Sequence, residues 1–264
     1  MPTLSASIVV YTGAPEALTA AMSVLKYTQR YDLTLYLIDN ASPDGSGEIL
    51  ERAVEHGVLS GRPNQRVEVV RSFENRGFGS GHNLVRDDLT SDYHFILNPD
   101  ILIESDVLGD MADWMEAHPY AVMSRPGLRF PSGEIQVLPL RRCSVRALVY
   151  RQLTFLKFWK KYNDKYVMAD VDLTVPTRIE FCTGSFAMIR TSVFQKIGGF
   201  DEKYFMYVED ADLTQKACKE GEVYLLPQFR AIHVWHRAAH KDWSHFKMQF
   251  RSMLRYFSKW GLRF

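Results

Sequence analysis

The chain has 264 residues, of which 46% are hydrophobic, and its formal net charge is +1. This composition is ordinary for a globular protein with a hydrophobic core. No apolar run approaches the roughly 18 residues that a membrane-spanning helix needs. Met1–Leu4 shows no basic region followed by an apolar stretch, so we expect no secretory signal. The sequence shows no repeat, low-complexity segment or clear linker, and we expect one domain over residues 1–264.

The cysteines and charges restrict the class of protein further. The three cysteines are far apart, form no metal or redox spacing, and suit a reduced, cytoplasmic setting; they are Cys143, Cys182 and Cys218. Residues 1–140 hold 10 Lys/Arg and 19 Asp/Glu, whereas residues 141–264 hold 22 and 12. The basic second half indicates either an anionic partner or charges that mix on the folded surface.

The first half alternates strand and helix signals. Runs rich in β-branched and apolar residues predict four strands, at Ser5–Tyr11, Leu33–Ile38, Val67–Val70 and Tyr93–Leu97. Pro15 followed by apolar residues at helical spacing predicts a helix after the first strand, and Glu48–Glu55 predicts another after the second. This order predicts a mostly parallel sheet covered by helices, with ligands at the carboxyl ends of its strands.

The second half is less regular. Pro131–Gly133 predicts a hairpin turn, Arg141–Lys165 is basic and aromatic, and a helix is expected from Asp210 to Lys219. We expect strands at Phe181–Ile189, Val223–Leu226 and Ala231–Val234. The tail predicts a helix with one apolar face, formed by Trp243, Phe246, Phe250, Met253 and Phe257.

Polar residues follow the predicted strands directly. Asp39 either accepts a hydrogen bond from a pyrimidine ring N–H or stabilises a turn. Asn98 and Asp100 offer hard oxygen ligands for Mg²⁺ or Mn²⁺ at the end of a buried strand, or else form a turn with a helix-capping Asp. The glycine-rich loop Asn75–Asn83 lets a ligand approach the backbone or is a flexible turn; it matches neither a P-loop nor a dinucleotide fingerprint.

Two later motifs offer acid–base and metal chemistry. A predicted helix begins with three acids, Glu209, Asp210 and Asp212. Either they complement the helix dipole, or one of them is a general base. His233 suits a metal ligand and Arg237 a diphosphate contact, and the alternative is a strand-end histidine with an exposed arginine.

In this order and spacing the segments resemble the family-2 glycosyltransferases, which have the GT-A fold, an α/β fold with a mostly parallel central sheet. The closest likeness is to the bacterial rhamnosyltransferase-like branch that builds surface polysaccharides, and it covers nearly the whole chain. The segments that carry the resemblance are Ser7–Tyr11, Leu37–Asn40, Asn75–Asn83, Leu97–Asp100, Thr183–Phe186, Gly199–Glu202, Glu209–Leu213, Ile232–Arg237 and Tyr256–Gly261.

The resemblance implies roles for individual residues. Asp210 is implied as the catalytic base, and Asp100 as the metal ligand, in a degenerate Asp-x-Asp motif that begins with Asn98. His233 is implied near the metal and the diphosphate. The residues expected at the donor nucleotide are Tyr11, Thr12, Asp39, Asn40, Arg76, Gly77, Asn83, Asn98 and Arg237. Those expected near the acceptor or sugar are Gly184, Tyr207, Glu209 and His236. Thr12-Gly13 stands where many relatives carry Asn.

The resemblance also implies an inverting single displacement that depends on Mg²⁺ or Mn²⁺. L-Rhamnose would move from dTDP-β-L-rhamnose to a hydroxyl of a lipid-linked or saccharide acceptor, with residues 1–100 binding the nucleotide and 101–264 the acceptor. The alternatives are a UDP-hexose-dependent transferase, a sugar-phosphate nucleotidyltransferase and a non-catalytic sugar- or nucleotide-binding protein. Tyr11–Ala14 lacks the basic residues of a nucleotidyltransferase loop. No nucleic-acid partner is expected.

The segment Arg141–Lys165 indicates peripheral contact with an anionic membrane at its cytoplasmic face. It carries eight Lys/Arg and one acid, Asp164, and apolar side chains are interleaved with the cations at Leu148, Phe155, Phe158 and Trp159. The alternative is a basic face for an anionic acceptor.

Overall fold

A computed structural model describes residues 1–152, 157–235 and 243–263. Within these ranges nine strands form one sheet in the order β3-β2-β1-β4-β8-β6-β9-β5, and β7 pairs with β9. The strands are β1 (Leu4–Val10), β2 (Leu33–Asp39), β3 (Gln65–Arg71), β4 (Tyr93–Leu97), β5 (Ile101–Leu102), β6 (Ala121–Arg129), β7 (Thr177–Arg178), β8 (Phe186–Arg190) and β9 (Glu222–His233). The helices are α1 (Ala14–Tyr27), α2 (Ser46–Glu55), α3 (Phe78–Asn83), α4 (Val107–Ala117), α5 (Val145–Gln152), α6 (Lys160–Tyr166), α7 (Thr191–Lys196), α8 (Glu209–Ala217) and α9 (Trp243–Trp260), with short 3₁₀ turns η1 (Arg86–Asp88) and η2 (Lys157–Trp159).

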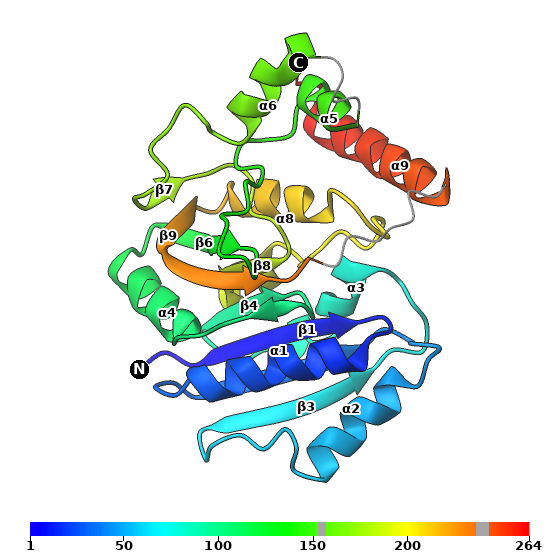
Figure 1. The fold of residues 1–264 in the computed structure, drawn as a ribbon, viewed down its shortest axis with the longest axis vertical. Helices are drawn as coiled ribbons and strands as arrows, with labels where there is room; N and C mark the ends of the chain where they lie inside the picture. The colour runs from blue at the N-terminus through cyan, green and yellow to red at the C-terminus, as the bar shows by residue number, and fades with distance from the viewer. Residues whose placement is uncertain (153–156, 236–242, 264) are drawn as a thin grey trace.

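The first four strands are parallel, as the alternating pattern predicts. β1 lies between β2 and β4, and β3 pairs with β2 on its other side. Figure 1 shows α1 in front of β1 and α2 beside β3. The register places Val10 opposite Asp39 and Asp39 opposite Arg71, so the carboxyl ends of β1, β2 and β3 form one edge.

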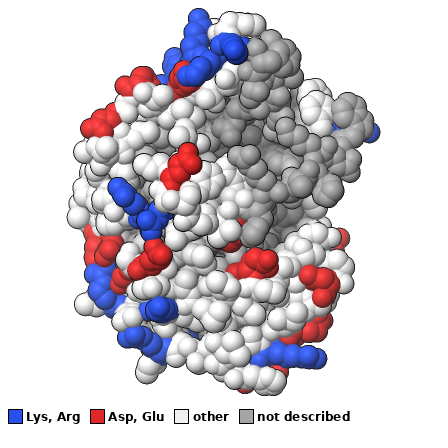
Figure 2. Space-filling model, viewed as in Figure 1, with Lys and Arg blue, Asp and Glu red and all other residues white. Residues whose placement is uncertain are grey.

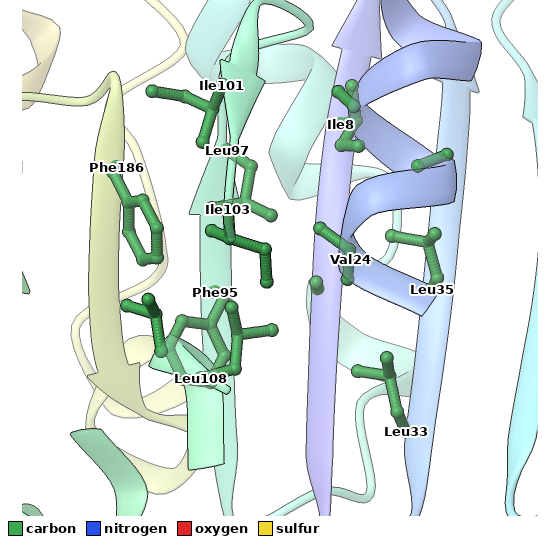
Figure 3. Packing of buried hydrophobic residues seen from close by; sticks show 14 of the residues in the cluster. Ile8, Val24, Leu33, Leu35, Phe95, Leu97, Ile101, Ile103, Leu108 and Phe186 are labelled. Atoms are coloured by element: carbon green, nitrogen blue, oxygen red, sulfur yellow. The ribbon is translucent and has the colours of Figure 1, made fainter. Parts of the chain in front are cut away.

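A hydrophobic core between β1, β2, β4 and α1 stabilises this half of the fold. Inward side chains of β1, β2 and β4 pack against α1, and Figure 3 shows Ile8, Leu35 and Val24 at this contact. Phe95 of β4 meets Phe186 of β8 edge to face, with ring centroids 6.2 Å apart. Complete burial of such side chains contributes about 1.5–3 kcal/mol each, so the strands beneath the site form a rigid platform.

The strands of the second half differ from the sequence expectation. β8 begins at Phe186 instead of 181, because the residues before it take an irregular path along α8. The two short strands expected near 223–234 are one strand, β9, whose pairing with β6 shifts register between Pro126 and Gly127. The sequence patterns also did not predict β5, β6, β7 or α4. β8 runs antiparallel to both β4 and β6, so the sheet is mixed beyond β4.

The glycine-rich loop is shaped by close backbone contacts. A Cβ on Gly79 would lie 2.8 Å from Phe200, and one on Gly81 would lie 2.8 Å from Val9. At Gly77, φ is +95° and a Cβ would lie 1.9 Å from the carbonyl oxygen of Phe205. These glycines let α3 pack directly on β1 and on the 200–205 segment.

The tail forms the expected helix, α9, and part of its apolar face packs on the core. Met253 and Phe257 of that face contact the core together with Tyr256, whereas Phe246 and Phe250 are exposed. The spacing of apolar residues predicted the face but not which of its side chains are packed.

The basic segment Arg141–Lys165 forms α5, η2 and α6, except for residues outside the described ranges, among them Phe155. Leu148 is buried beside α9, Arg141 pairs with Asp170, and Lys160 pairs with Asp164. Figure 2 shows Lys and Arg gathered at the end of the molecule where Figure 1 labels α6. In the described part of the chain, no helix is long and apolar enough to cross a bilayer. Membrane contact by this segment stays a prediction.

Candidate active site

Asp39 closes β2 as a buried carboxylate with protein partners on both oxygens. Its Oδ2 lies 2.9 Å from Nε of Arg71, and its Oδ1 accepts a 3.1 Å hydrogen bond from the backbone N–H of Ser42. Gly47 of α2 permits this pairing, because a Cβ there would lie 2.5 Å from the carboxylate and 2.4 Å from the guanidinium. Each carboxylate oxygen has a second lone pair, which is the capacity left for a base N–H.

The glycine-rich loop is joined to this edge through two asparagines. The side-chain amide of Asn40 donates to Oδ1 of Asn75 over 2.9 Å and to the carbonyl of Gly77 over 3.1 Å. Beyond β1 the chain turns through Thr12 at φ +65°, and the Tyr11 ring remains 52% exposed. An exposed aromatic ring beside Asp39 offers a stacking surface for a planar base.

Asp100 and His233 form the second polar pair. Nε2 of His233 lies 3.4 Å from Oδ1 of Asp100, and the backbone N–H of Val234 donates to the Asp100 carbonyl over 3.0 Å. The other ring nitrogen of His233 lies 2.9 Å from Oε1 of Gln136, whose amide N–H donates to the His233 carbonyl over 2.7 Å. Gln136 therefore fixes the orientation of an imidazole whose Nε2 faces a carboxylate.

Asp210 lies in the first turn of α8 and reaches back to Gly184. Its Oδ2 accepts a 3.0 Å hydrogen bond from the backbone N–H of Gly184, and its Oδ1 accepts one of 2.8 Å from the N–H of Ala211. A Cβ on Gly184 would lie 3.0 Å from Phe78 and 3.4 Å from Cβ of Asp210. The absence of a side chain at Gly184 lets the carboxylate approach the backbone.

The backbone before α8 is strained. Tyr207 and Val208 both have positive φ, at +70° and +58°. A β-branched residue in this region costs on the order of 1–3 kcal/mol, and such strain clusters at functional sites. The Tyr207 hydroxyl lies 2.9 Å from Nδ1 of His245. The strained pair turns the chain so that α8 presents its first acids toward residue 184.

Adjacent carboxyl groups perturb each other at this helix start. Burial raises the pKa of Glu209 to about 8, and the Asp210 carboxylate adds to the rise. Burial also raises the pKa of Asp210, although N–H groups of Gly184 and Ala211 and the charge of Arg125 oppose the rise. A carboxylate with a raised pKa is a better proton acceptor, so the environment of Asp210 suits a general base.

Asp212 serves a different purpose from its neighbours. It is buried and its carboxylate accepts hydrogen bonds from Nε1 of Trp260 over 2.7 Å and from Nζ of Lys259 over 2.9 Å. These contacts anchor α9 to α8, so Asp212 faces the fold and not the Gly184 side.

The remaining candidate residues are placed less directly at the site. Asn83 uses its amide to bind the carbonyl and N–H of Phe200 and the carboxylate of Glu202, and Arg76 is exposed and pairs with Glu74. Asn98 donates its backbone N–H to the Ser185 carbonyl over 2.9 Å. His236 and Arg237 lie outside the described residues. Nucleotide contacts by these side chains stay predictions.

Three residues that sequence reasoning missed belong to this arrangement. Arg71 could have been found from the sequence. It ends β3, which runs parallel to β2, and this register places it opposite Asp39. Gln136 follows the turn after β6 and gave no sequence signal. Arg125 is buried in β6; burial lowers the pKa of its guanidinium, and the nearby Asp210 charge opposes this effect.

Comparison with known protein families decides the class to which this site belongs. The family described as "Glycosyl transferase family 2" matches residues 5–198. The chain belongs to this family. The match includes the predicted nucleotide half and the Asn98–Asp100 motif, and α8 lies beyond it.

Curated family 2 relatives point to the branch suggested by the sequence. Rhamnosyltransferase WbbL of Escherichia coli K12 is 29% identical over 186 residues, which cover 66% of this chain and 66% of that protein. N-acetylglucosaminyl-diphospho-decaprenol L-rhamnosyltransferase of Mycobacterium tuberculosis H37Rv is 26% identical over 249 residues, 88% of this chain and 75% of that protein. The chain thus spans about two thirds to three quarters of the length of these relatives.

Solved structures confirm the GT-A fold. Mannosyltransferase PcManGT from Pyrobaculum calidifontis, solved with GDP-Man and Mn²⁺, has a TM-score of 0.64 at 17% identity over 96% of this chain and 64% of that one. GalNAc-T7, solved with UDP, GalNAc and Mn²⁺, has a TM-score of 0.67 at 14% identity over 96% and 48%. At these identities the likeness establishes the fold alone.

Proposed function

We propose that this family 2 protein is an inverting, metal-dependent glycosyltransferase. It moves L-rhamnose from dTDP-β-L-rhamnose to a hydroxyl of a lipid-linked or saccharide acceptor during bacterial surface polysaccharide synthesis. One observation carries the proposal. The backbone N–H of Gly184 donates a hydrogen bond to the Asp210 carboxylate, and the carbonyl of the next residue, Ser185, accepts one from the backbone N–H of Asn98. These two residues therefore tie the implied base directly to the implied metal motif, across β4 and α8.

Asp210 acts in this scheme as the general base. The acceptor hydroxyl attacks the anomeric carbon on the face opposite the departing nucleotide, and Asp210 takes its proton as the new bond forms. Burial raises the pKa of Asp210 and so favours proton uptake by its carboxylate. The bond from Gly184 fixes the direction of the carboxylate. A base positioned in this way contributes about 10²–10⁴-fold in rate.

Asp100 and His233 fit a divalent metal shared with the donor. A carboxylate and an imidazole, oriented by Gln136, are suitable ligands for Mn²⁺ or Mg²⁺. In the described ranges no group of three or more His, Cys, Asp or Glu could hold a metal by itself, which suits a site completed by diphosphate oxygens. When bound, the metal would offset the negative charge that develops on the leaving diphosphate.

The donor specificity rests on the edge formed by β1, β2 and β3. Asp39 accepts a ring N–H, Tyr11 covers the base, and the backbone near Gly77 approaches the phosphates. The rhamnose and the lipid-linked acceptor are supported by the names of the curated relatives. The single sheet that runs through residues 4–233 supports one domain, with 1–100 as its nucleotide half and 101–264 as its acceptor half.

Nucleotide and donor panels test the proposal. Calorimetry with dTDP, UDP, GDP and ADP should show the tightest binding for dTDP, followed by UDP. Nucleotide release from dTDP-rhamnose should exceed release from UDP-hexoses. Release from a UDP-hexose alone would establish the UDP-dependent alternative, and tighter binding of GDP or ADP would overturn the pyrimidine assignment. Nucleotide binding without release from any donor, with or without acceptor, would indicate a non-catalytic protein.

A further inference from the structure

A cationic cavity lies beside the glycine-rich loop, apart from the base and metal residues. Its volume is about 600 Å³, which is within the range of ligand pockets, roughly 300–1,000 Å³. It lies between α3, the 202–205 segment and α9. The residues that line it are Arg76, Ser80, Glu202, Lys203, Phe205, Lys247, Met248, Arg251, Ser252 and Arg255. Asp39, Asp100, His233 and Asp210 are not among them, so the cavity lies apart from these residues, although Arg76 is also expected at the donor nucleotide.

The charge of the cavity favours an anion with more than one negative charge. Five cations line it against one acid, Glu202. Three of the cations, Lys247, Arg251 and Arg255, recur every four residues and so line one side of α9. In the described part of the chain no acid forms an ion pair with these three side chains, although the charge of Arg255 acts on the Asp201 carboxylate and its guanidinium lies over the Tyr204 ring. Cationic groups that line one cavity are a usual recognition element for phosphate oxygens.

A buried hydroxyl supplies an independent indication of a ligand. Ser80, in α3, is 4% exposed and lines the cavity, and its Oγ has no hydrogen-bond partner among the described residues. A buried hydroxyl without a partner costs about 1–3 kcal/mol, and an oxygen of a bound phosphate would satisfy it. Neither the glycine-rich motif nor the helix α3 requires a hydroxyl at this position.

An apolar stripe runs along α9 next to the cations. Phe246, Phe250 and Leu254 each precede one of the three cations and are 47%, 53% and 57% exposed. Large apolar side chains aligned on a surface next to cations suit a ligand with both an anionic head and a hydrocarbon chain.

We propose that this cavity binds the phosphate groups of an amphiphilic, phosphate-bearing acceptor, while the α9 stripe contacts its lipid chain. The inference rests on the proposed function, because it specifies how a lipid-linked acceptor is held. Ser80 and the α9 cations bind the phosphates, and Phe250 contacts the chain. Phe205 lines the cavity and belongs to the segment that leads into α8 and Asp210, so an acceptor anchored here extends its sugar along this segment toward the base.

Calorimetry with farnesyl diphosphate, farnesol and inorganic pyrophosphate tests the site, with dTDP present to occupy the donor site. Farnesyl diphosphate should bind more tightly than either of the other two probes. The Arg251→Gln/Arg255→Gln double variant should bind it at least tenfold more weakly. Ser80→Ala should weaken binding several-fold, and Phe250→Gln should weaken farnesyl diphosphate but not pyrophosphate. The matched control is Arg52→Gln/Arg62→Gln, which removes two exposed cations elsewhere and should leave binding unchanged.

Separate readouts distinguish this site from the proposed function. Binding of dTDP and hydrolysis of the nucleotide sugar should stay within twofold of wild type in every variant, since they depend on the donor site. The inference is overturned if farnesyl diphosphate binds no better than farnesol, or if the double variant binds it normally. It is also overturned if the double variant loses only binding to vesicles of anionic lipid, which would make the surface a bilayer contact. Absence of hydrolysis in the wild type would count against the proposed function alone.

Discussion

The backbone N–H of Gly184 lies 3.0 Å from Oδ2 of Asp210 and donates a hydrogen bond to it. The next residue, Ser185, accepts a 2.9 Å hydrogen bond from the backbone N–H of Asn98. A segment of two residues therefore sets the position of the implied base relative to the implied metal motif. The relationship depends on Gly184 having no side chain, because Phe78 and Asp210 close around it.

Gly184→Ala should lower turnover more than donor binding. The added methyl group would lie 3.0 Å from Phe78 and 3.4 Å from Asp210, so one of them must move. Since small misplacements of reacting groups cost up to about 10²-fold in rate, we expect kcat to fall by about tenfold or more while the donor KM changes little. Gly127→Ala is the matched control, because its Cβ would meet other atoms only at 3.5 Å. Equal kcat values for the Gly184 variant and wild type would contradict the role of the segment.

Glu209→Gln should leave the acid limb of the rate profile unchanged. The rate rises with pH as Asp210 ionises, and burial raises the pKa at which this happens. The charge on Asp210 helps burial to raise the pKa of Glu209 to about 8, so Asp210 ionises first, while Glu209 is still protonated and uncharged. A limb of kcat/KM against pH that moves in either direction would show that Glu209 is charged while Asp210 titrates.

The same substitution should alter the dependence of stability on pH. The folded-state pKa of Glu209, about 8, lies above the unfolded value of about 4.3. Its contribution is therefore fully present below the unfolded pKa and is lost as pH rises through about 8. Urea unfolding should show Glu209→Gln to be more stable than wild type at pH 9 by a margin that shrinks at pH 6.

Removal of the metal should abolish transfer, and Mn²⁺ or Mg²⁺ should restore it. Asp100→Asn and His233→Ala should both raise the metal concentration for half-maximal activity, since each removes one of the two protein ligands. We expect a change on the order of tenfold or more. Asp87→Asn is the control, because Asp87 is an exposed acid that pairs with Arg86. Full activity of Asp100→Ala in EDTA would eliminate this metal site.

Arg71→Gln should destabilise the nucleotide edge. Within the described chain it leaves the buried carboxylate of Asp39 with the Ser42 N–H and without its cation. An unsatisfied buried group costs about 1–3 kcal/mol. Urea unfolding should show a loss of that size, with weaker dTDP binding. Arg66→Gln, whose side chain is exposed on the same strand, should change stability by less than about 0.5 kcal/mol. Similar losses in both variants would argue against a special role for the Asp39–Arg71 pair.

Local patterns were sufficient for the parallel half of the fold but not for the rest. Period and turn signals placed β1, β2, β3 and β4 within a few residues, because each strand is bounded by turn chemistry. Pro227 suggests in the sequence that a strand ends, but in the structure β9 continues past it with a register shift against β6. In α9 the spacing predicted the apolar face, but the burial of its individual side chains depends on α5 and α8, which are distant in sequence.

The site likewise contains residues that the sequence predicted and residues that it could not. Asp39, Asn40, Asn98 and Asp100 were placed by a general rule, since strand ends in parallel sheets meet at one edge. Gln136 and Arg125 could not be found, because their roles come from contacts with His233 and Asp210 across about 85–97 residues of chain. Position in the sequence alone also did not distinguish Asp210 from Asp212 as the candidate base. The structure distinguishes them, because the Asp212 carboxylate binds Trp260 of α9.

Sugar transfer by Asp210→Asn, measured beside nucleotide affinity, tests the central claim most directly. The substitution preserves size and can keep the hydrogen bond from Gly184, but it removes the proton acceptor. We predict that transfer falls by about 10²–10⁴-fold while dTDP affinity stays within a few-fold of wild type. Asp212→Asn should lower stability and, where the protein is folded, retain transfer. Normal transfer by Asp210→Asn, or loss of transfer in folded Asp212→Asn alone, would contradict the account.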